Sequence, residues 1–486
     1  MAKRLTRRDA LKHGGAVAAA AAASPLFSSP AVLAAPNPNS RLNCALIGCG
    51  GRGRSYLGGL MRQAAAGELA VVALADADEG SLGRGVHAVA KCAEQAKVKG
   101  FDAAKVKTFT DYRLLYDKSP NDIDAVFIAT PDHQHACPSM MAIQLGKHVY
   151  CEKPLVHHIY EARALGDAAR KAKVATQMGN QGSGTGNHQT LAEYLEAGAI
   201  GKVLEVHGWH GFFSRFGGSM PKPKPQPAPK GLDWDAWLGP ATARPFSSVY
   251  RPWHGWRDFG TGSLGGWGTH VMDAICFALK LGYPTTVELV EVDDPSDARF
   301  PMRATVRFDF PQRGDLPPVS VFWYDGCKPN TDPNLKGRDG KPVAKVGNYP
   351  ELHARIAKDH GRKLGNAGSI FVGEKGIICC GSHGGAPVIL PEARRKEFKP
   401  PAKTLPRPSG GIMGDFLRAA RKGGGPTFSG FGTFSGPFLE MFLVGHLAMF
   451  AGLHKPVQWD GENMKPTNRP ELEKFVKREY RKGWSL

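Results

Sequence analysis

The chain has 486 residues, and 63 Lys and Arg against 44 Asp and Glu give it a formal net charge of +19. A chain of this length with 42% hydrophobic residues buries a large core, which excludes disorder as its overall state. Its nine cysteines are odd in number, sparse and without metal-ligand spacing. They exclude a small disulfide-stapled scaffold, and we expect mostly buried thiols and no metal site.

The first 35 residues have the pattern of an export signal. Basic residues, Arg7 and Arg8 among them, precede an apolar run over 16–23, and small residues follow up to Ala35. This order is typical of a cleaved signal, and the run is too short for a membrane anchor. The stretch around Arg7 and Arg8 resembles the twin-arginine signal, which predicts export of the folded protein to the periplasm and no membrane span in the mature protein. The alternative is a basic N-terminal helix that stays attached.

From Arg41 onward, short apolar runs alternate with helical patterns. Such alternation is typical of a doubly wound parallel sheet, and it predicts an α/β dinucleotide-binding domain over 41–180. The expected strands are 42–48, 69–76, 106–109, 123–130, 148–151 and 174–178, and the expected helices are 53–66, 81–97, 135–145 and 159–172.

The character of the chain changes after residue 180. A proline-alternating stretch, 221–229, favours extended structure in an exposed loop or arm. The remaining pattern predicts a second α/β domain over 181–486 with a mainly antiparallel sheet. Its expected strands are 204–209, 286–292, 302–310, 319–324, 370–373 and 376–379, and its expected helices are 270–280 and 438–451.

A glycine motif follows the first apolar run. Gly48, Gly50 and Gly53 form G-x-G-x-x-G, with Gly51 and Arg52 between them, where a strand ends and a helix begins. In this context the glycines allow a tight turn and a close approach of the backbone to a pyrophosphate. Asp76 ends the next strand, where its carboxylate accepts hydrogen bonds from ribose hydroxyls and repels a 2′-phosphate. The motif therefore predicts NAD binding, with NADP disfavoured; the alternative is a glycine-rich turn beside a surface acid.

Two further strands end in polar motifs at the edge where ligands bind in this architecture. Thr130 and Pro131 begin the stretch that runs to His135, and Glu152 and Lys153 follow the next strand. We expect these residues to contact the cofactor. Within the first stretch Asp132 either caps a helix or belongs to the site. Near an oxidised nicotinamide the pKa of Lys153 falls, which allows proton exchange with a substrate hydroxyl; the alternative is a surface lysine.

Together, the glycine motif, the 130–135 stretch and the Cys-Glu-Lys-Pro-Leu stretch at 151–155 resemble the Gfo/Idh/MocA family. The resemblance implies a Rossmann domain followed by an α/β domain whose large open sheet often forms a dimer or tetramer interface. It also implies oxidation or reduction of sugar and cyclitol hydroxyls, and Lys153 matches the lysine of the family's Glu-Lys-Pro motif. His270 matches a second active-site residue, but Gly266 stands where the family usually has an Asp. Either Lys153 or His270 is therefore the expected catalytic base.

Candidate substrate-binding residues surround these motifs. Asn180 and Gln181 follow the sixth predicted strand, and Trp267 and Asp273 flank His270. Asp273 either orients His270 or lies on a helix surface. Six of the nine tryptophans fall within 209–267, where they either stack on a sugar ring or pack in the core.

These features predict a nicotinamide-dependent oxidoreductase acting on a sugar, cyclitol or glycoside. Because free NAD is scarce outside the cytoplasm, we expect a tightly held cofactor that is regenerated within the catalytic cycle. One alternative is an NAD-dependent glycoside hydrolase that oxidises C3 transiently and cleaves by elimination. Another is a non-catalytic protein that binds a sugar or a dinucleotide. The positive charge lies largely in loops such as 328–364 and 391–407, without a nucleic-acid-binding motif, so we expect no nucleic acid partner.

Overall fold

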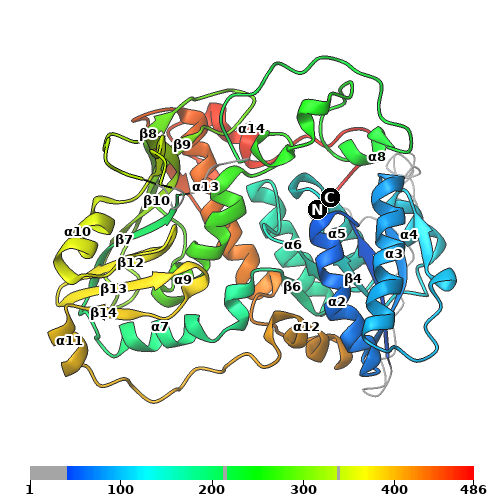
Figure 1. Cartoon of the computed structure of the whole chain (residues 1–486), viewed down its shortest axis with the longest axis horizontal. Helices are drawn as coiled ribbons and strands as arrows, with labels where there is room; N and C mark the ends of the chain where they lie inside the picture. The colour runs from blue at the N-terminus through cyan, green and yellow to red at the C-terminus, as the bar shows by residue number, and fades with distance from the viewer. Residues whose placement is uncertain (1–40, 212–215, 337–339) are drawn as a thin grey trace, which may run out of the picture. The chain divides into compact units, whose positions relative to one another are not determined.

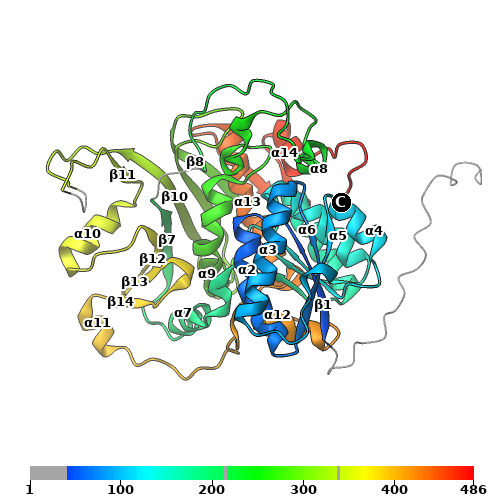
Figure 2. The ribbon, with the colours of Figure 1, turned by 45° about the vertical axis from the view of Figure 1, so that its right-hand side comes forward.

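The computed structural model describes residues 41–211, 216–336 and 340–486. The predicted export signal, residues 1–35, lies outside the described residues. Figures 1 and 2 show two sheets, one in the blue-to-cyan N-terminal part and one in the green-to-yellow part, with helices between them.

The N-terminal sheet consists of six parallel strands in the order β3-β2-β1-β4-β5-β6. The strand order reverses direction between β1 and β4, so a crevice opens at their carboxyl ends, where ligands bind in doubly wound sheets. The parallel doubly wound sheet expected from the sequence is therefore confirmed. The strands are β1 (Leu42–Ile47), β2 (Leu69–Ala75), β3 (Lys107–Phe109), β4 (Ala125–Ile128), β5 (His148–Cys151) and β6 (Thr176–Met178).

Helices cover both faces of this sheet because its strands are apolar on both sides. The first turns of α3 and α4 are capped by Asp78 and Asp111, whose side chains accept hydrogen bonds from Ser81 and Arg113 backbone N–H groups. A helix from far along the chain, α12 (Gly411–Arg421), also packs on the sheet and brings Phe416 against Phe127 and Tyr150. The other helices are α2 (Gly51–Ala65), α3 (Glu79–Gln95), α4 (Tyr112–Lys118), α5 (Ala136–Gln144) and α6 (Ile159–Ala172).

The second sheet has ten strands in the order β14-β13-β12-β7-β10-β9-β8-β15-β16, with β11 paired to β10. Only β7 and β10 pair in parallel within it, so the expected mainly antiparallel sheet is confirmed. Its strands are β7 (Val203–His210), β8 (Thr286–Asp293), β9 (Arg303–Phe310), β10 (Val319–Pro329), β11 (Lys345–Gly347), β12 (Ala367–Gly373), β13 (Gly376–Gly381), β14 (Val388–Leu390), β15 (Val457–Asp460) and β16 (Lys465–Pro466).

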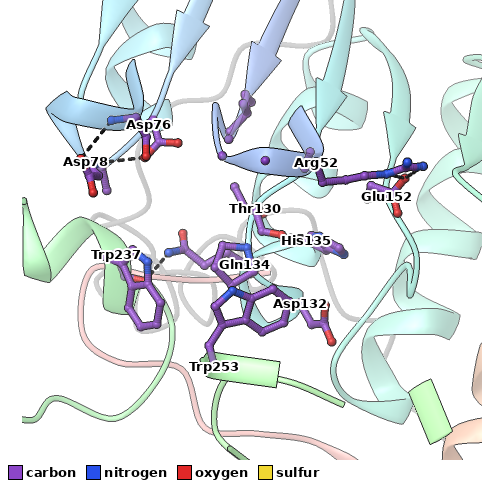
Figure 3. Close-up of a pocket in the computed structure, with 18 of the residues that line it drawn as sticks. Arg52, Asp76, Asp78, Thr130, Asp132, Gln134, His135, Glu152, Trp237 and Trp253 are labelled. Atoms are coloured by element: carbon purple, nitrogen blue, oxygen red, sulfur yellow. Dashed lines mark hydrogen bonds and ion pairs between the residues drawn. The ribbon is translucent and has the colours of Figure 1, made fainter. Parts of the chain in front are cut away.

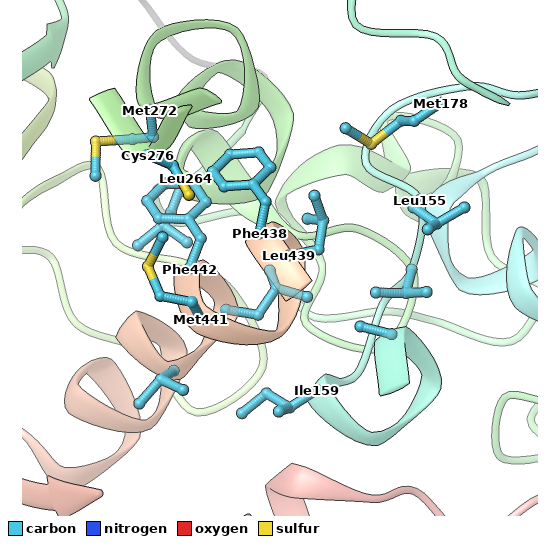
Figure 4. Packing of buried hydrophobic residues seen from close by; sticks show 14 of the residues in the cluster. Leu155, Ile159, Met178, Leu264, Met272, Cys276, Phe438, Leu439, Met441 and Phe442 are labelled. Carbon is cyan, nitrogen blue, oxygen red and sulfur yellow. The ribbon is translucent and has the colours of Figure 1, made fainter. Parts of the chain in front are cut away.

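The core between the two sheets is built around α13 (Gly436–Ala451), which packs against α6 and against β8 and β9. Figure 4 shows Phe438 and Phe442 of α13 beside Leu264 and Met272, with Leu155 and Ile159 of the first domain on the other side. Phe431–Ala451 is the described segment whose length and apolar composition would suffice to cross a membrane, and most of it is buried inside the protein. The remaining helices are α7 (Asn187–Glu196), α8 (Trp234–Leu238), α9 (Thr269–Leu279), α10 (Glu351–His360), α11 (Glu392–Glu397) and α14 (Glu473–Val476).

The cysteines behave as expected from their sparse spacing. All nine are free thiols, and all but the half-buried Cys92 are buried. Burial raises the pKa of the thiols of Cys44 and Cys380, which keeps them protonated and unreactive.

Candidate active site

A cavity of about 1100 Å³ opens at the carboxyl edge of the parallel sheet and is lined by residues from both domains. The structure brings most of the predicted site residues into its wall, and Figure 3 shows a selection of them. The predicted residues that line it are Gly48, Gly50, Gly51, Arg52, Asp76, Thr130, Pro131, His135, Glu152, Lys153, Gln181, Trp267 and His270.

The glycine loop has the geometry that a pyrophosphate requires. Gly48 has a φ of +91°, and a Cβ at Gly53 would lie 1.8 Å from the carbonyl oxygen of Gly48. Gly48 and Gly53 therefore allow the turn and the close packing of α2 on β1. At Gly50 and Gly51 a Cβ would meet nothing within 4 Å, so the backbone at the start of α2 is open to the cavity. These residues fit the diphosphate of a nicotinamide dinucleotide.

Asp76 lies at the end of β2 beside the glycine loop. Its carboxylate accepts hydrogen bonds from the backbone N–H groups of Cys49, at 2.6 Å, and Asp78, at 2.9 Å. Burial raises the pKa of Asp76, and these two hydrogen bonds oppose that shift. Asp76 also lines the cavity, where its carboxylate would meet a ribose of the cofactor.

Arg52 connects the glycine loop to the Glu-Lys-Pro stretch. Its Nε donates to Glu152 Oε1 at 2.7 Å, and the Tyr56 hydroxyl donates to the same oxygen. The other oxygen of Glu152 accepts the backbone N–H of Lys153 at 2.9 Å. The buried Glu152 therefore holds the backbone of Lys153 in place, and it is itself held from two positions on α2.

His135 ties together the loops after β4 and β5. Its Nδ1 lies 2.6 Å from the Pro154 carbonyl oxygen, and its Nε2 lies 2.9 Å from the Thr130 carbonyl oxygen. Burial alone would lower its pKa, but Cys151, Asp132 and the Pro154 carbonyl raise the pKa of His135 to about 10. A doubly protonated ring donates to both carbonyls. The adjacent Thr130 Oγ1 is buried and has no hydrogen-bond partner among the described residues, which suits a hydrogen bond to a bound cofactor.

Asp132 joins the two domains. Its Oδ2 accepts hydrogen bonds from the Thr261 hydroxyl at 2.6 Å and from the Thr261 backbone N–H at 3.1 Å. Asp132 lines the cavity, and the N-cap of the adjacent helical turn is Pro131, so the structure places the carboxyl group in the cavity wall and not at a helix cap.

Lys153 reaches across the cavity to the second domain. Its Nζ donates to the carbonyl oxygen of Gly266 at 2.8 Å. Gly266 belongs to a π-helical turn, Leu264–Gly268, immediately before α9. A Cβ at Gly266 would lie 2.7 Å from the ring of Phe216, so the packing leaves no room for a side chain there. The hydrogen-bond acceptor for Lys153 is therefore a backbone carbonyl, at the position where the family usually has an Asp.

His270 lies in the first turns of α9 and is 6% exposed. Burial lowers its pKa well below the ordinary value, and the charge of Lys153 adds to this effect. The ring is therefore neutral at pH 7 and able to accept a proton. Its Nδ1 has no hydrogen-bond partner in the described part of the chain. Trp267 lies beside it and stacks on His210 at 4.3 Å between ring centroids.

Two predicted substrate-binding residues lie behind this wall, and neither lines the cavity. Asp273 is fully buried and accepts a hydrogen bond from Asn180 Nδ2 at 2.9 Å. Its other oxygen lies 3.5 Å from His188 Nε2 and accepts the N–H of Ala274. Asn180 and Asp273 thus link the loop after β6 to α9, whereas the neighbouring Gln181 faces the cavity.

One wall of the cavity was not expected from the sequence motifs. Residues 229–259, which we call the strap, follow the proline-rich stretch and contact the first domain at two places. Backbone hydrogen bonds join Gly231 and Asp233 to residues 77–79, directly after Asp76. The carbonyl groups of Ala236 and Trp237 accept hydrogen bonds from the Gln134 side chain.

The strap therefore crosses the cavity from the end of β2 to the loop after β4. Figure 3 shows Trp237 and Trp253 on the side of the cavity opposite Asp76 and Arg52. Four of the six clustered tryptophans line the cavity, and the other two are buried in the core. In the sequence, this tryptophan cluster was a signal of the wall. Those lining the cavity are Trp234, Trp237, Trp253 and Trp267, and the buried ones are Trp209 and Trp256.

Family comparisons agree with this geometry. The family model described as "Oxidoreductase family, NAD-binding Rossmann fold" matches residues 42–180. The model described as "Oxidoreductase family, C-terminal alpha/beta domain" matches residues 189–309. Together they cover more than half of the chain. The chain belongs to the Gfo/Idh/MocA oxidoreductase family. Its first domain is an NAD(H)-binding Rossmann domain, and the family comprises NAD(P)-dependent oxidoreductases of sugars and inositols.

This Gfo/Idh/MocA protein also resembles individual proteins over shorter stretches. It is 34% identical over 116 residues to levoglucosan dehydrogenase from Pseudarthrobacter phenanthrenivorans, covering 24% of this chain and 28% of that protein. It is 31% identical over 133 residues to inositol 2-dehydrogenase from Salmonella typhimurium, covering 26% of this chain and 38% of that protein. These matches span well under half of each relative.

The fold is shared with a solved dehydrogenase. The WlbA dehydrogenase from Chromobacterium violaceum, in complex with NADH and UDP-GlcNAcA, aligns with a TM-score of 0.55 at 17% identity. The alignment covers 88% of this chain and 99% of that one. Among residues 41–211, 216–336 and 340–486, no group of three or more His, Cys, Asp or Glu side chains is placed to hold a metal ion.

Proposed function

We propose that this Gfo/Idh/MocA oxidoreductase acts on a hydroxyl of a sugar, cyclitol or glycoside with a tightly held NAD, oxidising it to a carbonyl and reducing the carbonyl in the reverse direction. The observation that carries the proposal is the convergence of Lys153 and His270, from different domains, in the cavity that begins at the glycine loop. The relatives named levoglucosan dehydrogenase and inositol 2-dehydrogenase support a polyhydroxylated ring as the substrate.

The two side chains suit different steps of proton transfer. Bound NAD supplies the acceptor for a hydride from the carbon that carries the reacting hydroxyl. Lys153, which now donates to the Gly266 carbonyl, donates instead to the substrate oxygen and stabilises negative charge there. His270 is kept neutral by burial and takes the proton from the hydroxyl. In the reverse direction His270 returns the proton.

The strap supports tight retention of the cofactor. A dinucleotide held between Asp76 and Lys153 would be covered by the strap, because the strap is bonded to residues 77–79 at one end and to Gln134 further along. Release requires these contacts to open. A retained cofactor must be restored by a second substrate or by the same substrate at the end of each cycle.

We also infer that residues 1–35 direct twin-arginine export and that the mature protein works in the periplasm as a homo-oligomer. The basic start, the apolar run and the twin arginines support export. A cofactor bound before export suits a pathway that carries folded cargo, and it removes the need for free NAD in the periplasm.

The test begins with the purified protein and no added cofactor. We expect denaturation to release about one nicotinamide dinucleotide per chain, identified by mass spectrometry. Addition of a sugar substrate should raise the absorbance at 340 nm in a single step that matches the amount of bound cofactor. The absorbance should fall again only when an acceptor sugar reoxidises that cofactor. Lys153→Met is the inactive control. Release of no dinucleotide contradicts tight retention, and steady release of free sugar from a glycoside without net reduction favours the glycoside hydrolase. If the protein binds the sugar without any change at 340 nm, and Lys153→Met binds it equally well, the result favours a non-catalytic binding protein.

Asp76 is expected to exclude NADP. A 2′-phosphate would place negative charge against its carboxylate, whereas Arg84 and Ser81 nearby on α3 could accept a phosphate once that charge is gone. We expect the wild-type protein to release NAD on denaturation and Asp76→Asn to release NADP in a proportion raised about tenfold, equivalent to about 1.4 kcal/mol. The asparagine keeps one acceptor for the Cys49 N–H. Asp122→Asn, in an exposed ion pair with Lys107, is the control that should leave the ratio unchanged. If the wild type, Asp76→Asn and Asp122→Asn release NADP and NAD in the same ratio, Asp76 does not exclude NADP.

A further inference from the structure

A second imidazole lies against the catalytic one. The ring of His383 is 4.3 Å from the ring of His270 between centroids, with an angle of 32° between their planes. His383 comes from the turn Ser382–Gly384, which joins β13 to β14, so it is far from His270 in the sequence. No motif singles it out.

The backbone at His383 adopts a conformation that a histidine takes only at a cost. Its φ is +62° and its ψ is +28°, in the left-handed region that favours glycine. Such a conformation persists where surrounding contacts hold it, often at functional sites. Gly384, the next residue of the same turn, also has a positive φ, of +65°, but a glycine adopts it without this cost.

The surroundings hold the turn against α7 and α9. A Cβ at Gly384 would lie 2.7 Å from the ring of His188 and 2.9 Å from Ala274, so the turn packs closely there. The Nδ1 of His383 lies 3.1 Å from the hydroxyl of Ser382, which fixes the ring from its own loop. The strained backbone and the close packing both place the imidazole on His270.

We propose that His383 is a positioning residue that packs on the ring of His270, orients it toward the substrate hydroxyl and keeps it in the neutral form. This inference rests on the proposed function of His270 as the base. His383 excludes water from one side of His270, and a buried imidazole without water prefers to be uncharged. Because His383 contacts His270 and lies outside the cavity lining, it acts through that residue.

The charged and titratable groups around the pair agree with this role. Burial lowers the pKa of His270, and Lys153, His383, Arg52 and His210 lower it further. Around His383, burial also lowers the pKa, Asp273 opposes this effect, and Lys153 and His188 add to it. Because His383 is among the groups that lower the pKa of His270, its removal should raise that pKa toward the ordinary value.

The experiment replaces His383 in the full-length holoenzyme. His383→Asn is chosen because asparagine tolerates the left-handed conformation and lacks the ring. His454→Asn is the matched control, because His454 is also a histidine with a positive φ, of 56°, but lies exposed near Glu288. The pKa of His270 is followed by NMR of histidine-labelled protein, with its signal assigned by its loss in His270→Gln.

We expect the pKa of His270 to rise by about one unit in His383→Asn and to stay unchanged in His454→Asn. The acidic limb of the pH profile of kcat/KM should move to higher pH by the same amount, because activity requires neutral His270. If the pKa of His270 does not move in a folded His383→Asn protein, the proposal is overturned. His383→Gly, which relieves the backbone strain, serves if the asparagine variant fails to fold. The NMR shift needs no substrate, so a protein that shows this shift but oxidises no sugar contradicts the proposed function alone.

Discussion

Lys153→Met is expected to lower kcat/KM by about 10²–10⁴-fold, the range for loss of a group that donates or accepts a proton in the transition state. Methionine has a similar length and no proton to donate, so the substrate oxygen loses its hydrogen bond and the neighbouring positive charge. The cofactor content should not change, because Glu152 holds the backbone N–H of residue 153 and not its side chain. The measurement is steady-state kinetics with the sugar that reduces the bound cofactor.

Two further variants make this result specific. Lys375→Met, in the exposed turn between β12 and β13, removes a lysine far from the cavity and should leave kcat/KM unchanged. Lys153→Arg keeps the positive charge and the donor but does not release its proton. If Lys153 acts as the donor and His270 as the base, the arginine variant should recover part of the lost activity. An arginine variant as inactive as the methionine variant would instead make Lys153 the base, and a fully active Lys153→Met would remove it from the mechanism.

The strands of the first domain could be predicted from the sequence because a sheet covered on both faces needs continuous apolar runs. β1, β4 and β5 fall within the predicted runs for this reason. The helices α4 and α12 were not predicted, although each buries one apolar face: Tyr112, Leu115 and Tyr116 in α4, and Ile412, Phe416 and Leu417 in α12. α12 packs on the first sheet through Phe416, and a contact between residues nearly 300 positions apart leaves no local signal.

The site was predictable where one strand end determined the position of a side chain. The glycine loop, Asp76 and Lys153 each follow from a buried strand, and all of them except Gly53, which packs under the turn, line the cavity. Asn180 also follows a strand, but its amide turns away from the cavity to donate to Asp273. The direction of a side chain depends on its partners, and those partners come from another domain.

Contacts made by the backbone were beyond the reach of sequence reasoning. The acceptor for the Lys153 side chain is the backbone carbonyl oxygen of Gly266. In the sequence, a glycine at this position shows that a carboxylate is missing but does not indicate which group replaces it. The strap likewise meets residues 77–79 through backbone groups, so its tryptophans suggested a sugar site but not a cover over the cofactor. His383 reaches His270 through the fold of a glycine-rich turn.

Two Gly→Ala substitutions in the glycine loop should separate the stability of the fold from the binding of the cofactor. Each adds a single methyl group. Gly53→Ala places a Cβ 1.8 Å from the Gly48 carbonyl oxygen, a backbone atom that cannot move without opening the turn. We expect the free energy of unfolding to fall by about 1–3 kcal/mol or more. The dinucleotide recovered after denaturation should also fall, because α2 no longer packs closely on β1.

Gly51→Ala is the contrasting change in the same loop. Its Cβ would meet no protein atom within 4 Å, and Gly51 has no positive φ, so alanine fits its backbone and stabilises by about 0.4–1 kcal/mol by restricting the unfolded chain. The protein stripped of cofactor should therefore be as stable as the wild type or more stable. The new methyl group nevertheless occupies the space through which a pyrophosphate approaches the start of α2, so the recovered NAD should fall at least tenfold, a loss of about 1.4 kcal/mol in binding. Gly58→Ala, further along α2, should gain stability and keep its NAD. Full NAD content in Gly51→Ala would show that the diphosphate does not bind at this loop, whatever the stability of the variant.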